Sequence, residues 1–113
     1  MIHRDSRTPW GKAQQVEYIT PWLTRVYTAG HGGYKVDRTH NGVIPEYARR
    51  KGGWYEEDCE WSIVFATLES LIKESAFDFA RENIASLIES KAHVDTFKNW
   101  YPKEYGMFFN KAQ

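Results

Sequence analysis

Apolar and polar residues alternate with a period of two over the first third of the chain, in stretches rich in β-branched and aromatic side chains. Residues 13–19 and 22–28 show this pattern, and residues 34–36 resume it briefly. In the second stretch Leu23, Arg25 and Tyr27 fall on one face. Because this period is typical of half-buried strands, the pattern predicts two antiparallel strands followed by a short third one.

Glycines interrupt the alternation between the second and third predicted strands, in the segment GHGG over residues 30–33. A tight turn needs positive φ at one or two positions, and glycine adopts positive φ without steric cost. The sequence therefore predicts that Gly30, Gly32 and Gly33 form a tight turn around His31. This turn would present Tyr34 and the residue after it.

The middle of the chain changes from polar to apolar. Pro45 is favoured at the first position of a helix, and the glycines at 52 and 53 are typical of a helix end, so residues 45–51 are expected to form one or two helical turns. Asp58 is the expected N-cap of an apolar segment over 61–68. The spacing there fits a helix, but a strand is the alternative that periodicity alone leaves open.

The last third follows a helical period. Ser75 and Asp78 fit a capping box, and an apolar stripe follows at spacings of three and four. His93 and Val94 interrupt this stripe, a short helix ends at Pro102, and residues 103–110 form a last turn. The stripe consists of Phe77, Ala80, Ile84, Leu87 and Ile88, and the last turn is expected to dock Met107, Phe108 and Phe109.

Together these patterns predict one α+β domain over residues 1–113, with a small antiparallel sheet in the N-terminal half and helices packed on it from the C-terminal half. A chain of 113 residues can bury a single core. Aromatic residues make up 16% of the chain, and each buries a large area, so a compact core is within reach.

Composition favours a cytoplasmic protein. The chain has one cysteine, Cys59, which rules out an internal disulfide framework. No apolar run is long enough to span a bilayer, and the first ten residues lack the apolar core of a signal peptide, so no membrane contact is expected.

The net charge is zero, but residues 1–53 carry +5 and residues 54–113 carry −5. Such halves can neutralise each other within the fold, pair between the copies of a homodimer or steer a charged partner.

His31 is the first candidate for catalysis. The segment GHGG leads into another predicted strand, and neither phosphate-binding glycine motif is present. An oxyanion hole built from glycine amides would need a nucleophile, and Cys59 lies among carboxylates that oppose thiolate formation. These observations argue against a phosphate site and a thiol nucleophile. A small hydrolase or transferase centred on His31 and an acidic partner is the alternative hypothesis that is left.

Two charged clusters are candidate binding surfaces. The acidic cluster could join His31 or His40 around a metal, but no metal-ligand spacing is visible, and no cofactor motif occurs in the chain. The basic cluster, with aromatic residues interleaved, could hold phosphates, although the pI near neutrality argues against a nucleic-acid-binding domain. The acidic cluster is Glu56, Glu57, Asp58 and Glu60, and the basic cluster is Lys35, Arg38, Arg49 and Arg50.

Several motifs resemble those of a small uncharacterised domain that bacteriophages, plasmids and other mobile elements carry, alone or beside anti-restriction-like domains. The resemblance covers nearly the whole chain. It implies no named reaction and no catalytic residues. The motifs are TPWG (8–11), HGGYKVDR (31–38), IPEYARRKGGWYEEDCEW (44–61) and NWYPKEY (99–105).

This resemblance implies a function by context. Small proteins of mobile elements often bind host machinery, and host-defence complexes such as CRISPR effectors are common targets. The leading hypothesis is therefore a stoichiometric inhibitor, an anti-CRISPR or similar anti-defence protein that binds a protein or ribonucleoprotein complex in the host cytoplasm. The acidic cluster would mimic nucleic-acid phosphate, or the basic cluster would grip an acidic or RNA-bearing partner. The alternatives are the enzyme centred on His31 and a nucleic-acid-binding accessory protein.

Overall fold

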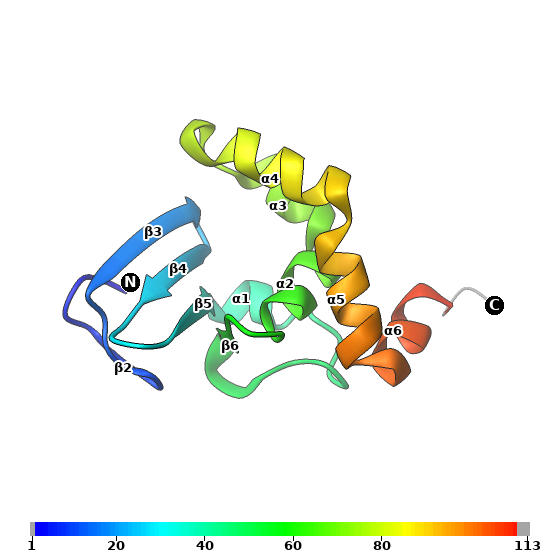
Figure 1. Ribbon diagram of the computed structural model, residues 1–113, viewed down its shortest axis with the longest axis horizontal. Coiled ribbons are helices and arrows are strands. Elements are labelled where there is room, and N and C mark those ends of the chain that lie inside the picture. The colour runs from blue at the N-terminus through cyan, green and yellow to red at the C-terminus, as the bar shows by residue number, and fades with distance from the viewer. Residues whose placement is uncertain (1, 111–113) are drawn as a thin grey trace.

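The computed structural model describes residues 2–110 and confirms the α+β class. A four-stranded antiparallel sheet in the order β3-β4-β5-β6 lies on one side of the molecule, and the helices of residues 61–109 lie on the other (Figure 1). A two-stranded hairpin precedes the sheet. The strands are β1 (Arg7–Thr8), β2 (Gly11–Lys12), β3 (Gln15–Thr20), β4 (Leu23–Tyr27), β5 (Gly32–Val36) and β6 (Trp54–Glu56).

The sheet confirms the three predicted strands and adds a fourth at its edge. β3 and β4 pair through Val16 and Val26, with a register shift near the turn at Pro21. Only three residues of β6 pair with β5, and Tyr55 lies opposite Tyr34. A strand this short has no readable period, and its partner is about twenty residues away, so the sequence pattern did not reveal it.

The predicted glycine turn is partly wrong. The turn itself spans Thr28 to His31, with the Thr28 N–H donating to the His31 carbonyl at 3.0 Å, and Gly30 has φ +85°. Gly32 and Gly33 instead belong to β5, where they pair with Tyr27 and the residue before it. A Cβ at Gly33 would overlap the Trp10 ring of the hairpin, so close approach and not turn geometry requires glycine there.

The predicted helical turns over 45–51 are confirmed only in part. Residues 45–49 form a single hydrogen-bonded turn, and a 3-10 turn covers Lys51–Gly53. Between them Arg50 is extended, because its N–H donates to the Tyr55 hydroxyl and its carbonyl accepts from the Asn41 side chain. These tertiary bonds replace the local helical ones. A helix of one turn, α1 (Arg38–Asn41), forms just before, capped by Asp37.

Residues 61–67 form a helix, which settles the alternative left open by the sequence. The expected N-cap is wrong, because Asp58 is exposed and caps nothing, and Glu60 occupies the N-cap position. The capping box at Ser75 is also wrong. The chain is extended at Ala76 and Phe77, and the Phe77 N–H donates to the Ile19 carbonyl of β3, so a contact with the sheet starts the next helix.

The remaining helices are longer than the pattern predicted. The helix of residues 78–90 ends at Lys91, which has φ +59°. His93 and Val94 were expected to interrupt a helical stretch, but they lie inside the next helix. The predicted last turn is a full helix, in which Phe108 packs against the core and Met107 is exposed. The helices are α2 (Trp61–Thr67), α3 (Glu69–Ser75), α4 (Asp78–Ser90), α5 (Ala92–Trp100) and α6 (Pro102–Phe109).

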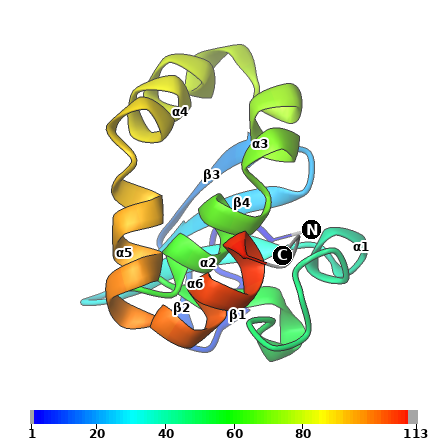
Figure 2. The same cartoon turned by 90° about the vertical axis from the view of Figure 1, so that its right-hand side faces the viewer.

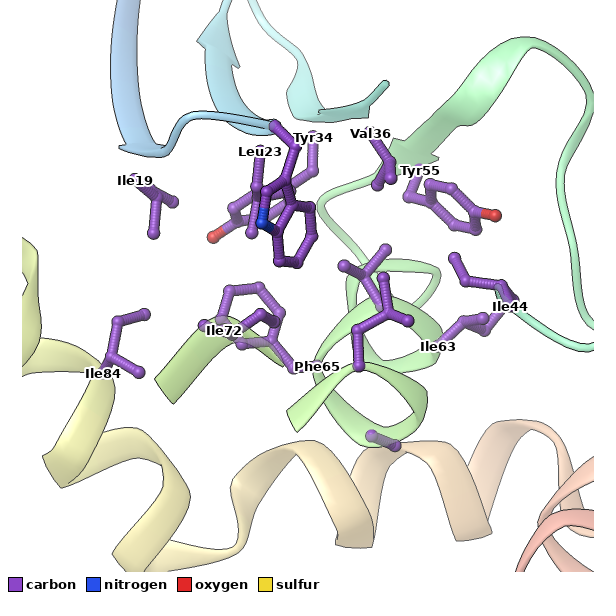
Figure 3. Packing of buried hydrophobic residues seen from close by; sticks show 14 of the residues in the cluster. Ile19, Leu23, Tyr34, Val36, Ile44, Tyr55, Ile63, Phe65, Ile72 and Ile84 are labelled. Carbon is purple, nitrogen blue, oxygen red and sulfur yellow. The ribbon is translucent and has the colours of Figure 1, made fainter. Parts of the chain in front are cut away.

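The core fills the space between the sheet and the helices. Figure 2 shows α4 and α5 following one another along one side, and α2 packs against α5 and β6. Figure 3 shows side chains of the strands meeting those of α2, α3 and α4. Labelled among them are Ile19, Leu23, Tyr34, Val36, Ile63, Phe65, Ile72 and Ile84, all of which are buried.

One polar pair is buried among these helices. The His93 ring on α5 has no exposed surface, and its Nε2 lies 2.5 Å from the Glu69 carboxylate at the start of α3. The other ring nitrogen, Nδ1, has no partner among the described residues. Within the part of the chain that the structure describes, Glu69 therefore supplies the one hydrogen bond of a fully buried imidazole.

Replacing Glu69 with alanine is expected to lower the free energy of unfolding by about 1–3 kcal/mol, because the buried imidazole loses its hydrogen-bond partner. Urea denaturation measures the change. Glu74→Ala on the same helix is the matched control, since Glu74 is exposed and its loss should cost less than about 0.5 kcal/mol. Equal effects of the two substitutions would contradict the stabilising role of the Glu69–His93 hydrogen bond.

Candidate functional site

A row of polar and aromatic side chains crosses the sheet from strand to strand. Glu17 on β3 is paired with Arg25 on β4, and Arg25 is paired with Tyr34 on β5. Since directly paired residues point to the same face of a sheet, these three side chains lie side by side. That face is the one that Leu23 shares with Arg25, and Leu23 is part of the core. The row therefore turns toward the helices.

Above this row, the sheet and α4 enclose a groove made of two adjoining hollows. Their volumes are about 400 Å³ and 230 Å³, and both are lined by Arg25, Tyr34 and Leu87. The floor is formed by the sheet and Phe65, and the far wall by α4, which faces β3 and β4 in Figure 1. The other lining residues are Glu17, Ile19, Tyr27, Glu57, Trp61, Phe79, Ala80, Asn83 and Ile84.

Arg25 is the central polar group of the groove. Its guanidinium lies over the rings of Tyr27 and Tyr34, at 4.8 and 5.3 Å from their centroids. Nη1 donates to the Tyr34 hydroxyl at 3.0 Å, and Nη2 is 3.7 Å from a carboxylate oxygen of Glu57, too far for a hydrogen bond. Nε is buried and has no partner among the described residues. Arg25 therefore keeps donors that no group in residues 2–110 uses.

The Arg25 guanidinium and the Tyr34 phenol both keep their ordinary charge states. Burial lowers the pKa of Arg25, but the neighbouring tyrosines and Glu57 outweigh burial and raise it above its usual value. Burial raises the pKa of Tyr34, and Arg25 only partly opposes this. Near neutral pH the site therefore holds a cationic guanidinium next to a protonated phenol. The phenol accepts a hydrogen bond from Arg25 and has its own O–H left to donate.

The acidic cluster is largely tied to the rest of the chain. Glu60 accepts from Arg50 Nε at 2.6 Å and from the Glu56 N–H at 2.9 Å, and Glu57 faces Arg25. The pKa of the Glu56 carboxyl is raised by burial and by the negative charge of Asp58. Glu56 and Asp58 are thus the members that remain without an ion pair among the described residues.

The basic cluster divides into two parts. Arg49 donates to the carbonyls of Ile44 and Gly42, and Arg50 binds Glu60 and lies over the Tyr101 ring, so these two arginines hold the loop around residues 42–50. Lys35 and Arg38 instead line a separate hollow of about 270 Å³. Lys35 also donates to the Gly52 carbonyl and lies over the Trp54 ring.

His31 is exposed at the tip of its turn, and its ring makes no hydrogen bond within residues 2–110, neither to a carboxylate nor to Cys59. The Cys59 sulfur lies 3.1 Å from the Tyr101 hydroxyl instead. Tyr34, which the sequence placed with the His31 turn, is buried in β5 and lines the groove. No group of three or more His, Cys, Asp or Glu side chains in the described part of the chain is arranged to hold a metal ion.

Tyr34 and Glu57 were predicted as site residues from the sequence, but Arg25, which contacts both, was not. The sequence contains a feature that could have identified Arg25, because Arg25 shares a predicted strand face with Leu23 and Tyr27. A charged residue on an otherwise apolar face needs an ion-pair partner or a ligand, since burying an unpaired charge is costly. The contribution of α4 carried no such signal. Phe79 and Asn83 line the groove because α4 lies next to the sheet in the folded chain, which the sequence pattern does not show.

Within the described residues, no helix has the length and apolar character needed to cross a membrane. Comparison with curated proteins finds no significant match, and comparison with solved structures finds none either. A family model described as a domain of unknown function matches residues 3–113. This confirms the resemblance to an uncharacterised domain over nearly the whole chain. The protein belongs to the family of the domain of unknown function DUF7007.

Proposed function

We propose that the protein is a phage or mobile-element accessory protein that acts in the host cytoplasm by binding and inhibiting a host defence complex, an anti-CRISPR or similar stoichiometric inhibitor. The observation that carries the binding role is the groove with its exposed aromatic rim. Phe79 is 62% exposed, and its ring stacks on that of Phe77 at 6.0 Å. Exposed aromatic side chains beside a hollow are typical of protein-binding surfaces.

The rim continues into a second, apolar hollow of about 310 Å³ at the edge of the sheet, next to β3. It is lined by Tyr18, Thr20 and Pro21 together with the two phenylalanines of the rim. Groove and hollow thus share Phe79 and give a partner a continuous surface with an aromatic anchor at its centre. The defence complex as target rests on the motif resemblance.

The test is an inhibition assay with a panel of purified CRISPR effector and restriction complexes. We expect one complex to co-elute with the protein at a fixed stoichiometry and its cleavage of target DNA to stop at about one equivalent. Inhibition far below one equivalent would indicate catalysis and contradict the proposal. So would full activity of every complex in the panel.

Phe79→Ser is expected to weaken this inhibition at least about tenfold, because an aromatic anchor at an interface commonly contributes more than 1.4 kcal/mol. Trp100→Ser is the matched control, since Trp100 is 66% exposed and lies on α5, away from the groove lining. Titration of the purified complex with each variant measures the change. Equal losses in both variants would place the binding surface elsewhere.

A second candidate function is nucleic-acid binding at the hollow that Lys35 and Arg38 line. Arg38 is exposed and has no ion-pair partner among the described residues, and Trp22 and Pro21 form an apolar wall beside it. A steep loss of affinity for short DNA or RNA with added salt would support this function. Absence of binding at low salt would contradict it.

A further inference from the structure

We propose that the groove recognises a carboxylate next to an apolar side chain, in a segment of the partner protein, and that this carboxylate displaces Glu57 from Arg25. The inference rests on the proposed binding function and specifies the chemistry of its partner. It identifies Arg25 and Tyr34 as the specificity-determining residues. Phe65, Ile84 and other apolar residues of the groove would hold the neighbouring side chain.

Among the described residues, the groove holds a surplus of unpaired hydrogen-bond donors. Arg25 Nε has no acceptor, Arg25 Nη2 reaches none within hydrogen-bond distance, and the Tyr34 hydroxyl accepts a bond without donating one among the described residues. Buried donors are normally paired, and an unpaired one is costly. Nε and Nη2 share one edge of the guanidinium, which is the edge that binds a carboxylate through two parallel bonds. The surplus therefore fits a ligand that brings acceptors.

Glu57 occupies this place only loosely. Its carboxylate stops 3.7 Å from Nη2, and its side chain is 36% exposed. The Glu57 backbone N–H is bound to the Gly32 carbonyl, which ties the residue to the start of β5. A long ion pair of this kind contributes little, whereas a two-bond contact is among the stronger polar interactions. Exchange of Glu57 for a better-placed carboxylate is therefore favourable.

The surroundings favour a single carboxylate over a phosphate. Glu17 lies on the rim beside Arg25, and its charge opposes an incoming anion, more strongly for a dianion. The walls are apolar, with Ile19, Phe65 and Leu87 at the groove, which suits an aliphatic or aromatic side chain next to the charge. The larger hollow is within the usual size range of small ligand sites, about 300–1,000 Å³.

The test uses the full chain and two probes that differ only at the charge, N-acetyl-L-phenylalanine and N-acetyl-L-phenylalaninamide. In ¹H–¹⁵N spectra the Nε–H signal of Arg25 reports directly on the proposed contact. We expect the acid to shift this signal with a dissociation constant on the order of 1 mM, since so small a ligand has few atoms with which to bind. The amide is expected to bind at least about fivefold more weakly, because it lacks the charge-assisted bonds.

Two substitutions give opposite expectations. Glu57→Gln removes the competing carboxylate and is expected to tighten binding of the acid severalfold. Arg25→Lys keeps the charge, loses the two-bond edge and is expected to weaken binding about tenfold. Arg49→Lys is the control and is expected to change nothing, because Arg49 does not line the groove and its Nε and Nη2 bind backbone carbonyls of the loop. The wild-type Nε–H signal tests the proposal even if a variant fails to fold.

Three outcomes would overturn the inference: no shift of the Arg25 signal, equal binding of acid and amide, or weaker binding of the acid by Glu57→Gln. The last would show that Glu57 does not compete with the bound carboxylate. Failure of this inference is distinguishable from failure of the proposed function. Phe79-dependent inhibition without probe binding would leave the function standing and remove the carboxylate, and probe binding without any inhibition would do the reverse.

Discussion

Replacing Phe65 with alanine is expected to lower the free energy of unfolding by about 3–5 kcal/mol, the usual cost of removing a fully buried phenylalanine. Phe65 on α2 is 1% exposed and packs edge-on against Tyr34 of β5 at 5.3 Å and against Trp61 at 5.7 Å. It is therefore the ring that joins the sheet to the helices. Since small domains have only about 5–15 kcal/mol of stability in total, the loss should be plain in urea denaturation.

The same substitution on the rim of the groove is the control for this prediction. Phe79 lines the groove too but is largely exposed, so Phe79→Ala should cost less than about 1 kcal/mol. A loss below 1 kcal/mol at Phe65 as well would mean that the helices do not pack on the sheet as described.

Replacing Gly33 with alanine is expected to destabilise the protein by about 3 kcal/mol, at the upper end of the range for overpacking. The added methyl group would overlap the Tyr55 carbonyl of β6 and lie 2.8 Å from Cζ2 of Trp10. The carbonyl cannot withdraw without opening the β5–β6 pairing, and Trp10 is held edge-on against Trp54 at 5.6 Å. Thermal and urea denaturation measure the loss.

Gly106→Ala should change stability in the opposite direction. Gly106 lies in α6, and a Cβ there would meet only the end of the Asn110 side chain at 3.9 Å. Alanine in a helix is favoured over glycine by about 0.5–1 kcal/mol, so this variant is expected to gain stability. A neutral or stabilising Gly33→Ala would refute the close packing of hairpin and sheet on β5.

The candidate site was predictable only in part. Tyr34 was expected on a strand, and Glu57 was expected in a functional acidic cluster, since aromatic and acidic residues stand out in a sequence. That the two would meet at Arg25 was not expected. Their meeting depends on the register Arg25↔Tyr34 and on the path of the chain from β5 to β6, which brings Glu57 to the start of β5.

For the basic cluster, too, the sequence did not show which side chains are free to bind a partner. Arg49 and Arg50 were expected to face a partner because arginine is a common contact residue. In the structure their donors are used on the carbonyls of residues 42–48 and on Glu60. A sequence shows that a charge is present, but only the surrounding fold shows whether it is already paired.

Local periodicity determined the α+β class, the pairing of β3 with β4 and the presence of α4, because alternation and helical spacing arise from side chains that are near neighbours in the chain. Tertiary structure alone decided the rest. Asn41 and Tyr55 bind the backbone of Arg50 and end the predicted helical turns after the first one. The Phe77 N–H donates to β3 where a capping box was expected. Such hydrogen bonds join different elements of the fold, so local periodicity does not reveal them and they become visible only once the chain is folded.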